Sequence, residues 1–336
     1  MRIAMISTVY HATPPTGYGG IERVVYRLTE ELVRQGHEVT LFGAKGSRCS
    51  GKTVVLDSYD PSQAPSGIRK GSDIINEEAM YESMKVYLEK NPVDIIHDFT
   101  FQNLYVLRHP QSFPFIISTC VPPTKGYVRP NLVACSQAHA QHCGPKTKFV
   151  HYGLNMDEFP AEFNKTTPMI HISKIASYKA QHLAIDAARK LKAQLWVAGN
   201  IEEKAYYYTQ ILPRLFISPT VKYIGEIQGT TAHLKTAKAL IQTPQWFDAF
   251  PLVVLESLAC GTPVIGLKMG GLPEQIKNGV NGFLCDTPQD LKQAMKEIDS
   301  IKPQDCRSYA EKHFNITRMA KDYIDLYDQS RKGVSW

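Results

Sequence analysis

The sequence lacks the features of membrane-spanning, fibrous and disordered chains. It contains no apolar run of about eighteen residues, so we expect no transmembrane helix. The apolar start, Met1–Tyr10, is too short for a signal peptide. Charged residues make up 21% of the chain and no long polar segment stands out, which excludes extended disorder. We therefore expect a cytoplasmic protein, with attachment to a membrane surface as an open alternative.

The cysteines form no recognisable framework, and the basic residues do not cluster. The seven cysteines are an odd number, are widely spaced and include no C-x-x-C pair, which argues against a disulfide framework and structural zinc. The formal net charge of +6 is scattered, without the dense lysine and arginine run of a nucleic-acid-binding protein. We expect no nucleic-acid partner; the mild positive charge suits an anionic small ligand or an acidic membrane surface.

Three ligand-binding motifs are missing or lack their context. No G-x-G-x-x-G follows the first apolar segment, which removes the main support for a dinucleotide dehydrogenase. No two aspartates are separated by a single residue, so a sugar transferase that holds Mn²⁺ or Mg²⁺ through such a pair is unsupported. Residues 46–53 satisfy G-x-x-x-x-G-K-T, but strand-favouring residues and the turn-rich segment Asp57–Pro65 follow. Because a P-loop requires a helix there, we interpret this segment as a surface loop.

Predicted strands and helices alternate along the whole chain. Arg2–Thr8 predicts a strand, 11–20 a glycine- and proline-rich loop, and 21–33 a helix, because its apolar residues recur at helical spacing. Val39–Phe42 predicts the next strand, and such βαβ units build parallel sheets. The other predicted strands are 94–97, 115–118, 132–135, 169–173, 194–198, 221–224, 239–242 and 263–267, and the other predicted helices are 181–191, 252–258 and 309–327.

This alternation predicts an α/β fold. Because 336 residues exceed what one hydrophobic core usually organises, we expect two doubly wound, Rossmann-like domains that face each other across a cleft. Ligands would bind at the carboxyl ends of the strands.

Two glycines and two lysines are candidates for binding an anion. Gly19 and Gly20 precede the first predicted helix, whose N-terminal amides and dipole attract negative charge, although an ordinary turn has the same composition. Lys174 and Lys179 follow a predicted strand of the second half, where two cations can converge on a diphosphate. Taken alone, two solvated lysines are the simpler interpretation.

Two carboxylates flank the start of the helix predicted at 252–258. Pro251 suits the first position of that helix, which leaves Asp248 in the preceding loop. Glu256 would lie inside the helix among apolar neighbours, where a carboxylate is costly to bury unless hydroxyl groups donate to it. The segment 270–274, GGLPE, repeats the arrangement of strand, glycine turn and helix start, and offers a second anion-accepting helix end.

With these residues in place, the chain resembles glycosyltransferase family 4, a retaining, nucleotide-sugar-dependent group with the GT-B fold. The resemblance covers nearly the whole length and is carried by GGIERVVYRLTEELVRQGHEV (19–39), LVACSQAHA (132–140), 153–159, SKIASYKAQHLAIDAA (173–188), DAFPLVVLESLACGTPVIG (248–266) and GGLPEQI (270–276). The last two segments are the most specific in order and spacing.

The resemblance implies a donor site in the second half of the chain. It places Glu256 on the ribose hydroxyls of the nucleotide and Asp248 where the family's first glutamate contacts the donor sugar. It also assigns Phe250, Leu252 and Val253 to the donor-binding segment.

The resemblance further implies how the diphosphate is bound. Lys174 takes the place of the usual arginine and Lys179 that of the usual lysine, while Gly19 and Gly20 give amides to the same group. The leaving diphosphate would be stabilised electrostatically while the acceptor hydroxyl attacks from the same face. The resemblance therefore implies neither a metal nor a cofactor; the partners are a UDP- or GDP-linked sugar and an unidentified acceptor.

Four departures from the family pattern affect this assignment. Asp248 is one methylene shorter than the family's glutamate, Pro251 removes a backbone N–H, and Ala180 replaces a glycine. The family's histidine is absent where this chain has 118–121, STCV. His97, at a predicted strand end, is a substitute candidate for the catalytic set, although a lone histidine is more often structural.

The resemblance also sets the expected domain boundaries. Residues 1–152 would form the acceptor-side domain and 153–308 the donor domain, and by analogy 309–336 would cross back to the first domain. His11 is a weaker catalytic candidate, and the loops Gly43–Gly71 and Pro122–Pro130 would shape the acceptor pocket. Two alternatives stay open: a non-catalytic nucleotide-sugar binder, and a nucleotide-sugar epimerase or sugar phosphorylase on the same scaffold.

Overall fold

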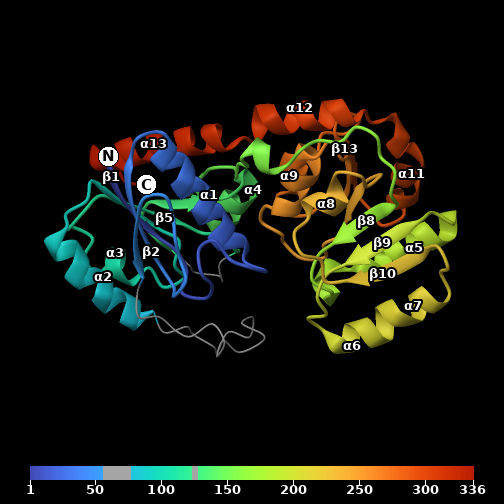
Figure 1. The fold of residues 1–336 in the computed structure, drawn as a ribbon, viewed down its shortest axis with the longest axis horizontal. Coiled ribbons are helices and arrows are strands. Elements are labelled where there is room, and N and C mark those ends of the chain that lie inside the picture. Colours follow the sequence, from blue (N-terminus) through green and yellow to red (C-terminus); the bar gives the residue numbers. More distant parts are fainter. Residues whose placement is uncertain (56–76, 123–127) are drawn as a thin grey trace. The chain divides into compact units, whose positions relative to one another are not determined.

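The computed structural model describes residues 1–55, 77–122 and 128–336. The chain forms two compact units: unit 1 comprises Met1–Gly153 and Ile316–Trp336, and unit 2 comprises Leu154–Asn315 (Figure 1). Parts of the loops expected to shape the acceptor pocket, and the turn at 57–65, lie outside the described residues.

Unit 1 is built on a parallel sheet with the strand order β3-β2-β1-β4-β5-β6-β7. The described strands are β1 (Arg2–Ile6), β2 (Glu38–Gly43), β3 (Lys52–Val55), β4 (Ile95–Asp98), β5 (Phe115–Ser118), β6 (Leu132–Ala134) and β7 (Lys148–Phe149). The helices are α1 (Gly20–Arg34), α2 (Glu78–Lys90), α3 (Leu104–Arg108), α4 (Gln137–Cys143) and α13 (Ile316–Arg331). Uninterrupted apolar runs such as that of β1 become fully buried because helices cover both faces of the sheet.

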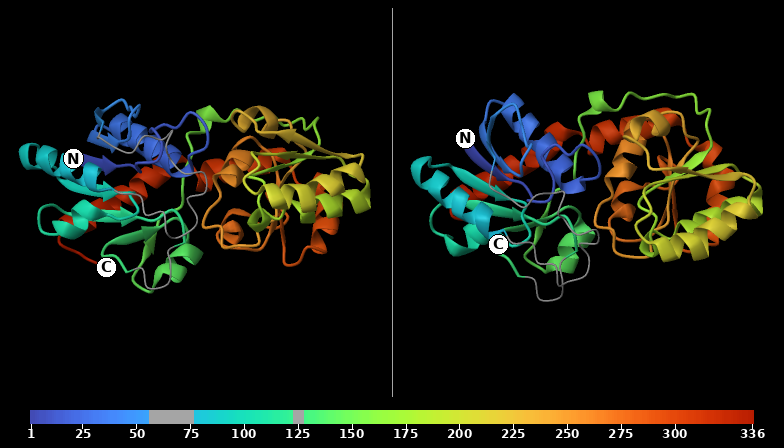
Figure 2. Two further views of the ribbon diagram at one scale, coloured as in Figure 1. Left: turned by 90° about the horizontal axis from the view of Figure 1, so that it is seen from below. Right: turned by 60° about the horizontal axis from the view of Figure 1, so that its bottom comes forward.

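Unit 2 repeats this architecture with the strand order β10-β9-β8-β11-β12-β13. Its strands are β8 (Met169–Ile172), β9 (Leu195–Ala198), β10 (Val221–Gly225), β11 (Leu240–Gln242), β12 (Val264–Leu267) and β13 (Gly282–Cys285). Its helices are α5 (Gln181–Leu191), α6 (Lys204–Tyr206), α7 (Leu212–Phe216), α8 (Thr231–Leu234), α9 (Leu252–Ala259), α10 (Leu272–Gln275), α11 (Asp290–Glu297) and α12 (Pro303–His313). Helices α5 and α7 lie on one side of the sheet and α9 and α12 on the other (Figure 2). The two parallel sheets confirm the predicted α/β class.

The apparent P-loop does not form. Lys52 and Thr53 begin β3, which pairs in parallel with β2 at the edge of the sheet. No helix therefore begins at Lys52, which confirms the prediction made from the strand-favouring residues that follow it. Our interpretation of the segment as a loop was wrong, because Lys52–Val55 continues the sheet.

The stretch 309–327 is helical as predicted except at 314 and 315, where one helix ends and another begins. Helix α12 ends at His313 and α13 begins at Ile316. Phe314 is 1% exposed, and its carbonyl accepts a hydrogen bond of 2.8 Å from Leu154 N–H. Burial of this ring and use of its carbonyl outside the helix break the helical hydrogen-bond ladder. As a result α12 belongs to unit 2, whereas α13 packs beside α1 in unit 1 (Figure 1).

Candidate functional site

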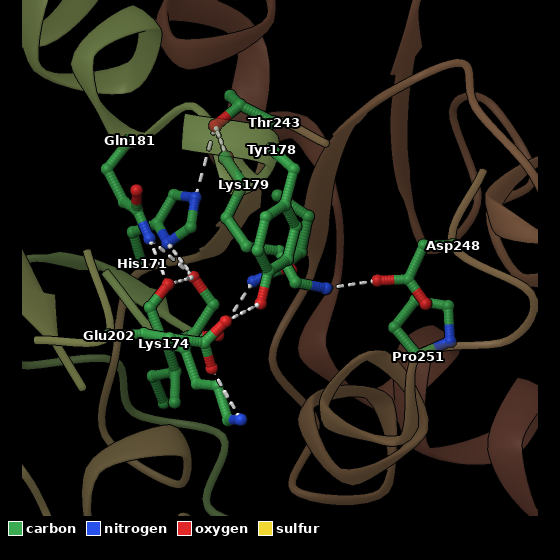
Figure 3. Close-up of polar contacts among 12 residues, drawn as sticks. His171, Lys174, Tyr178, Lys179, Gln181, Glu202, Thr243, Asp248 and Pro251 are labelled. Atoms are coloured by element: carbon green, nitrogen blue, oxygen red, sulfur yellow. Dashed lines mark hydrogen bonds and ion pairs between the residues drawn. The ribbon is translucent and has the colours of Figure 1, made fainter. Parts of the chain in front are cut away.

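The two candidate lysines lie beyond the carboxyl end of β8, on the loop that leads to α5. Lys174 forms an ion pair of 2.5 Å with Glu202, and the same carboxylate accepts the Tyr178 hydroxyl at 2.8 Å (Figure 3). Glu202 follows β9, so the carboxyl ends of two neighbouring strands supply the pair. Sequence reasoning missed Glu202, although its position just after a predicted strand was a usable signal.

Lys179 lies opposite the second candidate carboxylate. Its ammonium group forms an ion pair with Asp248, which precedes α9 (Figure 3). The same ammonium group lies 5.8 Å from the centre of the Tyr178 ring and 5.7 Å from that of the Trp246 ring. The side chains of Lys179 and Asp248 are 17% and 14% exposed, so both can still meet a ligand.

A buried hydrogen-bond network fixes the backbone that carries Lys179. The Thr243 hydroxyl donates to the carbonyls of Lys179 and Ala180, both at 3.0 Å. Because that hydroxyl proton is used, the Nε2–H of His171 donates to Thr243 Oγ1 at 3.1 Å (Figure 3). Burial lowers the pKa of His171 to about 3, so the ring is neutral and Nδ1 carries no proton when Nε2 donates.

Gln181 joins the first lysine to this network. Its side-chain amide donates to the carbonyl of Lys174 at 2.7 Å and to Ser173 Oγ at 2.8 Å. Ser173 Oγ in turn lies 3.4 Å from Nδ1 of His171. The backbone positions of both lysines are therefore set by one buried set of polar groups. Patterns of spacing in the sequence gave no indication of this network.

Two glycines hold the loop that carries Asp248. Gly271 N–H donates to the Asp248 carbonyl at 2.9 Å. A Cβ on Gly270 would lie 2.0 Å from the Asp248 carbonyl oxygen, and one on Gly271 would lie 2.1 Å from the Ala249 carbonyl oxygen. The GGLPE segment thus has a steric role, since only glycine permits this close approach of two backbones.

Helix α9 presents the remaining donor-site residues. Pro251 is the N-cap residue rather than the first helical residue as predicted. Glu256 is 7% exposed, and the Thr230 hydroxyl donates to its carboxylate at 2.7 Å. The prediction that a buried Glu256 carboxylate needs a hydroxyl donor is therefore confirmed. Phe250 is buried, whereas Leu252 and Val253 are partly accessible.

The remaining glycine candidates belong to unit 1, at the start of α1. Gly20 is the first helical residue and Gly19 the N-cap, so the helix begins one residue before the predicted range. A Cβ on Gly19 would lie 2.8 Å from the Pro15 side chain, whereas the space around Gly20 is open. Their amides are therefore at a helix N-terminus, where negative charge is favoured.

His97 does not belong to a catalytic set. Its ring is fully buried in unit 1, with Nδ1 2.8 Å from the Tyr327 hydroxyl and Nε2 2.7 Å from the Ser118 hydroxyl. Burial also lowers the pKa of His97 well below its usual value. Because both ring nitrogens are used inside the fold, this histidine is structural and the catalytic prediction for it is wrong.

The described residues offer neither a cluster of metal ligands nor a membrane span. They contain no group of three or more histidine, cysteine, aspartate or glutamate side chains placed to hold a metal ion. No helix within the described ranges has the length and apolar character needed to cross a bilayer.

Two family models match the chain. The model for glycosyl transferases group 1 matches residues 155–313, and the model for Glycosyltransferase Family 4 matches residues 18–119. The chain belongs to glycosyltransferase family 4. The first match contains all the unit 2 site residues described above, and the second contains Gly19 and Gly20.

Curated relatives and solved structures support the family and the GT-B fold. N-acetyl-alpha-D-glucosaminyl L-malate synthase of Bacillus anthracis is 30% identical over 171 residues, which are 50% of this chain and 43% of that protein. The first curated relatives are thus matched over less than half of their length. The crystal structure of AviGT4, a glycosyltransferase involved in avilamycin A biosynthesis, has a TM-score of 0.79 and 21% identity, with 100% and 99% of the two chains covered. Anabaena HepE, crystallised with UDP-glucose, has a TM-score of 0.69 and 16% identity, with 98% and 100% covered.

Proposed function

We propose that this protein is a retaining glycosyltransferase that transfers a sugar from a UDP- or GDP-linked donor to an acceptor hydroxyl without a metal ion. The observation that carries the proposal is the ion pair between Lys179 and Asp248 within unit 2. Lys174 lies on the same loop as Lys179, and Glu256 lies on α9, the helix that follows Asp248. Family membership supports the reaction class, and the UDP-glucose bound to Anabaena HepE supports the donor class.

Each charge has a task in this proposal. Lys174 and Lys179 bind the diphosphate, and Asp248 accepts hydroxyl groups of the donor sugar. Glu256 exchanges its hydrogen bond from Thr230 for the ribose hydroxyls. The lysines are preorganised, because Glu202 and the His171–Thr243 network hold them before any ligand binds.

The chemistry follows from where charge develops. The bond between the anomeric carbon and the diphosphate oxygen breaks, and a bond from the acceptor oxygen to the same carbon forms on the same face. Negative charge grows on the departing diphosphate, and fixed cations stabilise it more in this transition state than in the bound donor. Two ammonium groups thereby supply the charge stabilisation that a divalent ion supplies in metal-dependent transferases.

A nucleotide panel followed by turnover tests the proposal. UDP, GDP, ADP and their glucose conjugates are added to the protein, and the shift in melting temperature is measured, since a ligand that binds the native state stabilises it. We expect UDP or GDP, but not ADP, to raise the melting temperature. Transfer to a pool of hydroxyl acceptors is then measured with and without EDTA, and NMR gives the anomeric configuration of the product.

The outcomes separate the alternatives. Retained configuration and equal rates with EDTA support the proposal. Binding without hydrolysis or transfer favours a non-catalytic binder, and interconversion of the free sugar nucleotide favours an epimerase. Absence of any nucleotide-dependent shift contradicts the donor assignment.

A further inference from the structure

A pocket in unit 1 lies between the loop after β1 and the turn after β2. Its volume is about 190 Å³, and its lining includes His11, Thr16, Tyr18 and Lys45. Both segments follow the carboxyl ends of neighbouring parallel strands, which is the edge where α/β sheets bind ligands. None of its lining residues belongs to the donor site proposed in unit 2.

The walls of this pocket are fixed to each other by buried hydrogen bonds. Thr13 is fully buried; its N–H donates to Ser47 Oγ at 2.9 Å and its hydroxyl lies 2.6 Å from that of Ser7. Its carbonyl accepts the N–H of Arg48 at 2.8 Å. The loop and the turn therefore behave as one preformed wall, which reduces the entropy lost when a ligand binds.

Glycine gives the turn its shape. Gly46 has φ +89, a left-handed conformation that favours glycine, and a Cβ there would lie 3.5 Å from Ala12. A Cβ on Gly43 would lie 2.5 Å from Ser47 Oγ, so a side chain there would displace the serine that holds Thr13. Gly46, the first glycine of the apparent P-loop motif, thus allows the backbone conformation of the turn that carries Lys45.

The pocket carries positive charge. Lys45 is exposed, and among the described residues no hydrogen bond or ion pair holds its ammonium group. The lining includes no carboxylate. The nearby acid Glu22 is buried and accepts the Thr8 hydroxyl; desolvation raises its pKa, and the charge of His11 acts in the opposite direction. An incoming anion therefore meets the Lys45 ammonium and the His11 ring without an exposed competitor.

We infer that this pocket binds an anionic group, a carboxylate or a phosphate, of the acceptor molecule. The inference rests on the proposed transferase function and adds the substrate class. Lys45 donates to the anion oxygens from the turn, and His11 does so from the loop. A volume of about 190 Å³ accommodates a phosphate together with a few carbon atoms, which leaves a neighbouring hydroxyl of the same molecule as the nucleophile.

Calorimetry with small probes tests the inference. Inorganic phosphate, L-malate and neutral glycerol are titrated into the wild type, Lys45→Ala and Lys146→Ala, each with and without saturating nucleotide. Lys146 is an exposed lysine of unit 1 outside the pocket, so its variant matches the change in net charge. We expect an anion to bind the wild type and Lys146→Ala within about twofold of each other, and Lys45→Ala about tenfold or more weakly, as expected for the loss of one charged hydrogen bond. Glycerol should not bind.

The source of the anion follows from which probe binds. Phosphate binding indicates a phosphorylated acceptor and malate binding a carboxylate acceptor. Failure of both probes with the wild type, or equal weakening by both lysine substitutions, overturns the inference. A higher donor KM in Lys45→Ala with unchanged anion affinity also overturns it, because the pocket would then serve the donor. Absence of nucleotide binding contradicts the proposed function, whereas the titrations without nucleotide still test the pocket.

Discussion

The Lys179 ammonium group and the Asp248 carboxylate form an ion pair between loops that are 69 residues apart in the sequence. The pair neutralises two charges that the proposed function assigns to different parts of the donor. A diphosphate that binds Lys179 therefore competes with Asp248, which becomes available to the sugar hydroxyls. Entry of the donor would exchange the ion pair for contacts of Lys179 with the diphosphate and of Asp248 with hydroxyl donors, so neither charge would lack a polar partner.

Substitution of Lys179 tests its role in the leaving-group step. We expect Lys179→Ala to lower kcat about 10²- to 10³-fold, as for the loss of one preorganised group that stabilises developing charge. The melting temperature should change little, because the side chain is partly exposed. The matched control is Lys190→Ala, an exposed lysine in α5. Equal activity of Lys179→Ala and Lys190→Ala would show that Lys179 has no role in the leaving-group step.

Glu256 tests the nucleotide half of the donor site. We expect Glu256→Gln to weaken UDP or GDP binding about tenfold or more, because hydrogen bonds to a charged group contribute about 1.5–3 kcal/mol. Titration calorimetry gives the affinity. Thr230→Val serves as the control: it removes one hydrogen-bond donor to the carboxylate but keeps the charge, so its nucleotide affinity should stay within a few-fold of the wild type. If Thr230→Val lost more nucleotide affinity than Glu256→Gln, the Glu256 carboxylate would not be the group that binds the nucleotide.

Substitution of two glycines distinguishes the cost of a steric clash from the cost of an unfavourable backbone conformation. Gly270 and Gly279 both have positive φ, +55 and +74, but a Cβ would contact the Asp248 backbone only at Gly270. We expect Gly279→Ala to cost about 1–2 kcal/mol of unfolding free energy and Gly270→Ala to cost about 1–3 kcal/mol more. Urea denaturation measures the difference. Gly270→Ala should also lower activity, since it displaces Asp248; similar stability of the two variants would contradict the close approach.

The neutral His171 makes stability depend on pH. Its pKa is lowered to about 3 in the folded state from a usual value of 6.5, so between these values the unfolded chain binds one more proton than the native protein. This contribution to stability is complete above pH 6.5 and is lost as the pH falls, at about 1.4 kcal/mol per pH unit. His139, with a pKa lowered to about 4, acts in the same direction.

Glu77 acts in the opposite direction. Burial raises its pKa from 4.5 to about 7, so it favours the folded state as the pH falls through 7 toward 4.5. The difference in unfolding free energy between His171→Gln and the wild type therefore gives the pH dependence that is due to His171 alone, because Glu77 is present in both proteins. Urea unfolding between pH 7 and pH 5 should give a flatter profile for the variant, and parallel profiles would show that His171 is not neutral.

Local patterns were sufficient to predict most strands and the helices that carry the site. The strand predicted at 115–118 and the helix predicted at 181–191 match the structure to the residue, because a buried apolar run and helical spacing are local signals. The break between α12 and α13 could not be predicted, since it depends on Phe314 packing and on a hydrogen bond from Leu154, 160 residues earlier.

The candidate site shows the same limit. The residue types and their loops were predicted, but the pairing of Lys179 with Asp248 and of Lys174 with Glu202 depends on which strands are neighbours in the sheet. His97 was misassigned because a histidine at a strand end has the same sequence signal whether its ring points to solvent or, as here, into the core.

Because α13 returns to unit 1, unit 2 is one uninterrupted stretch inserted into another fold. Leu154 and Asn315, its first and last residues, pair with each other as an isolated bridge, so its two ends are neighbours. A fragment of 154–315 would therefore keep its sheet and all four of the proposed donor-binding charges on a single peptide. The surrounding fold, by contrast, could be made alone only by splicing together two pieces of the gene.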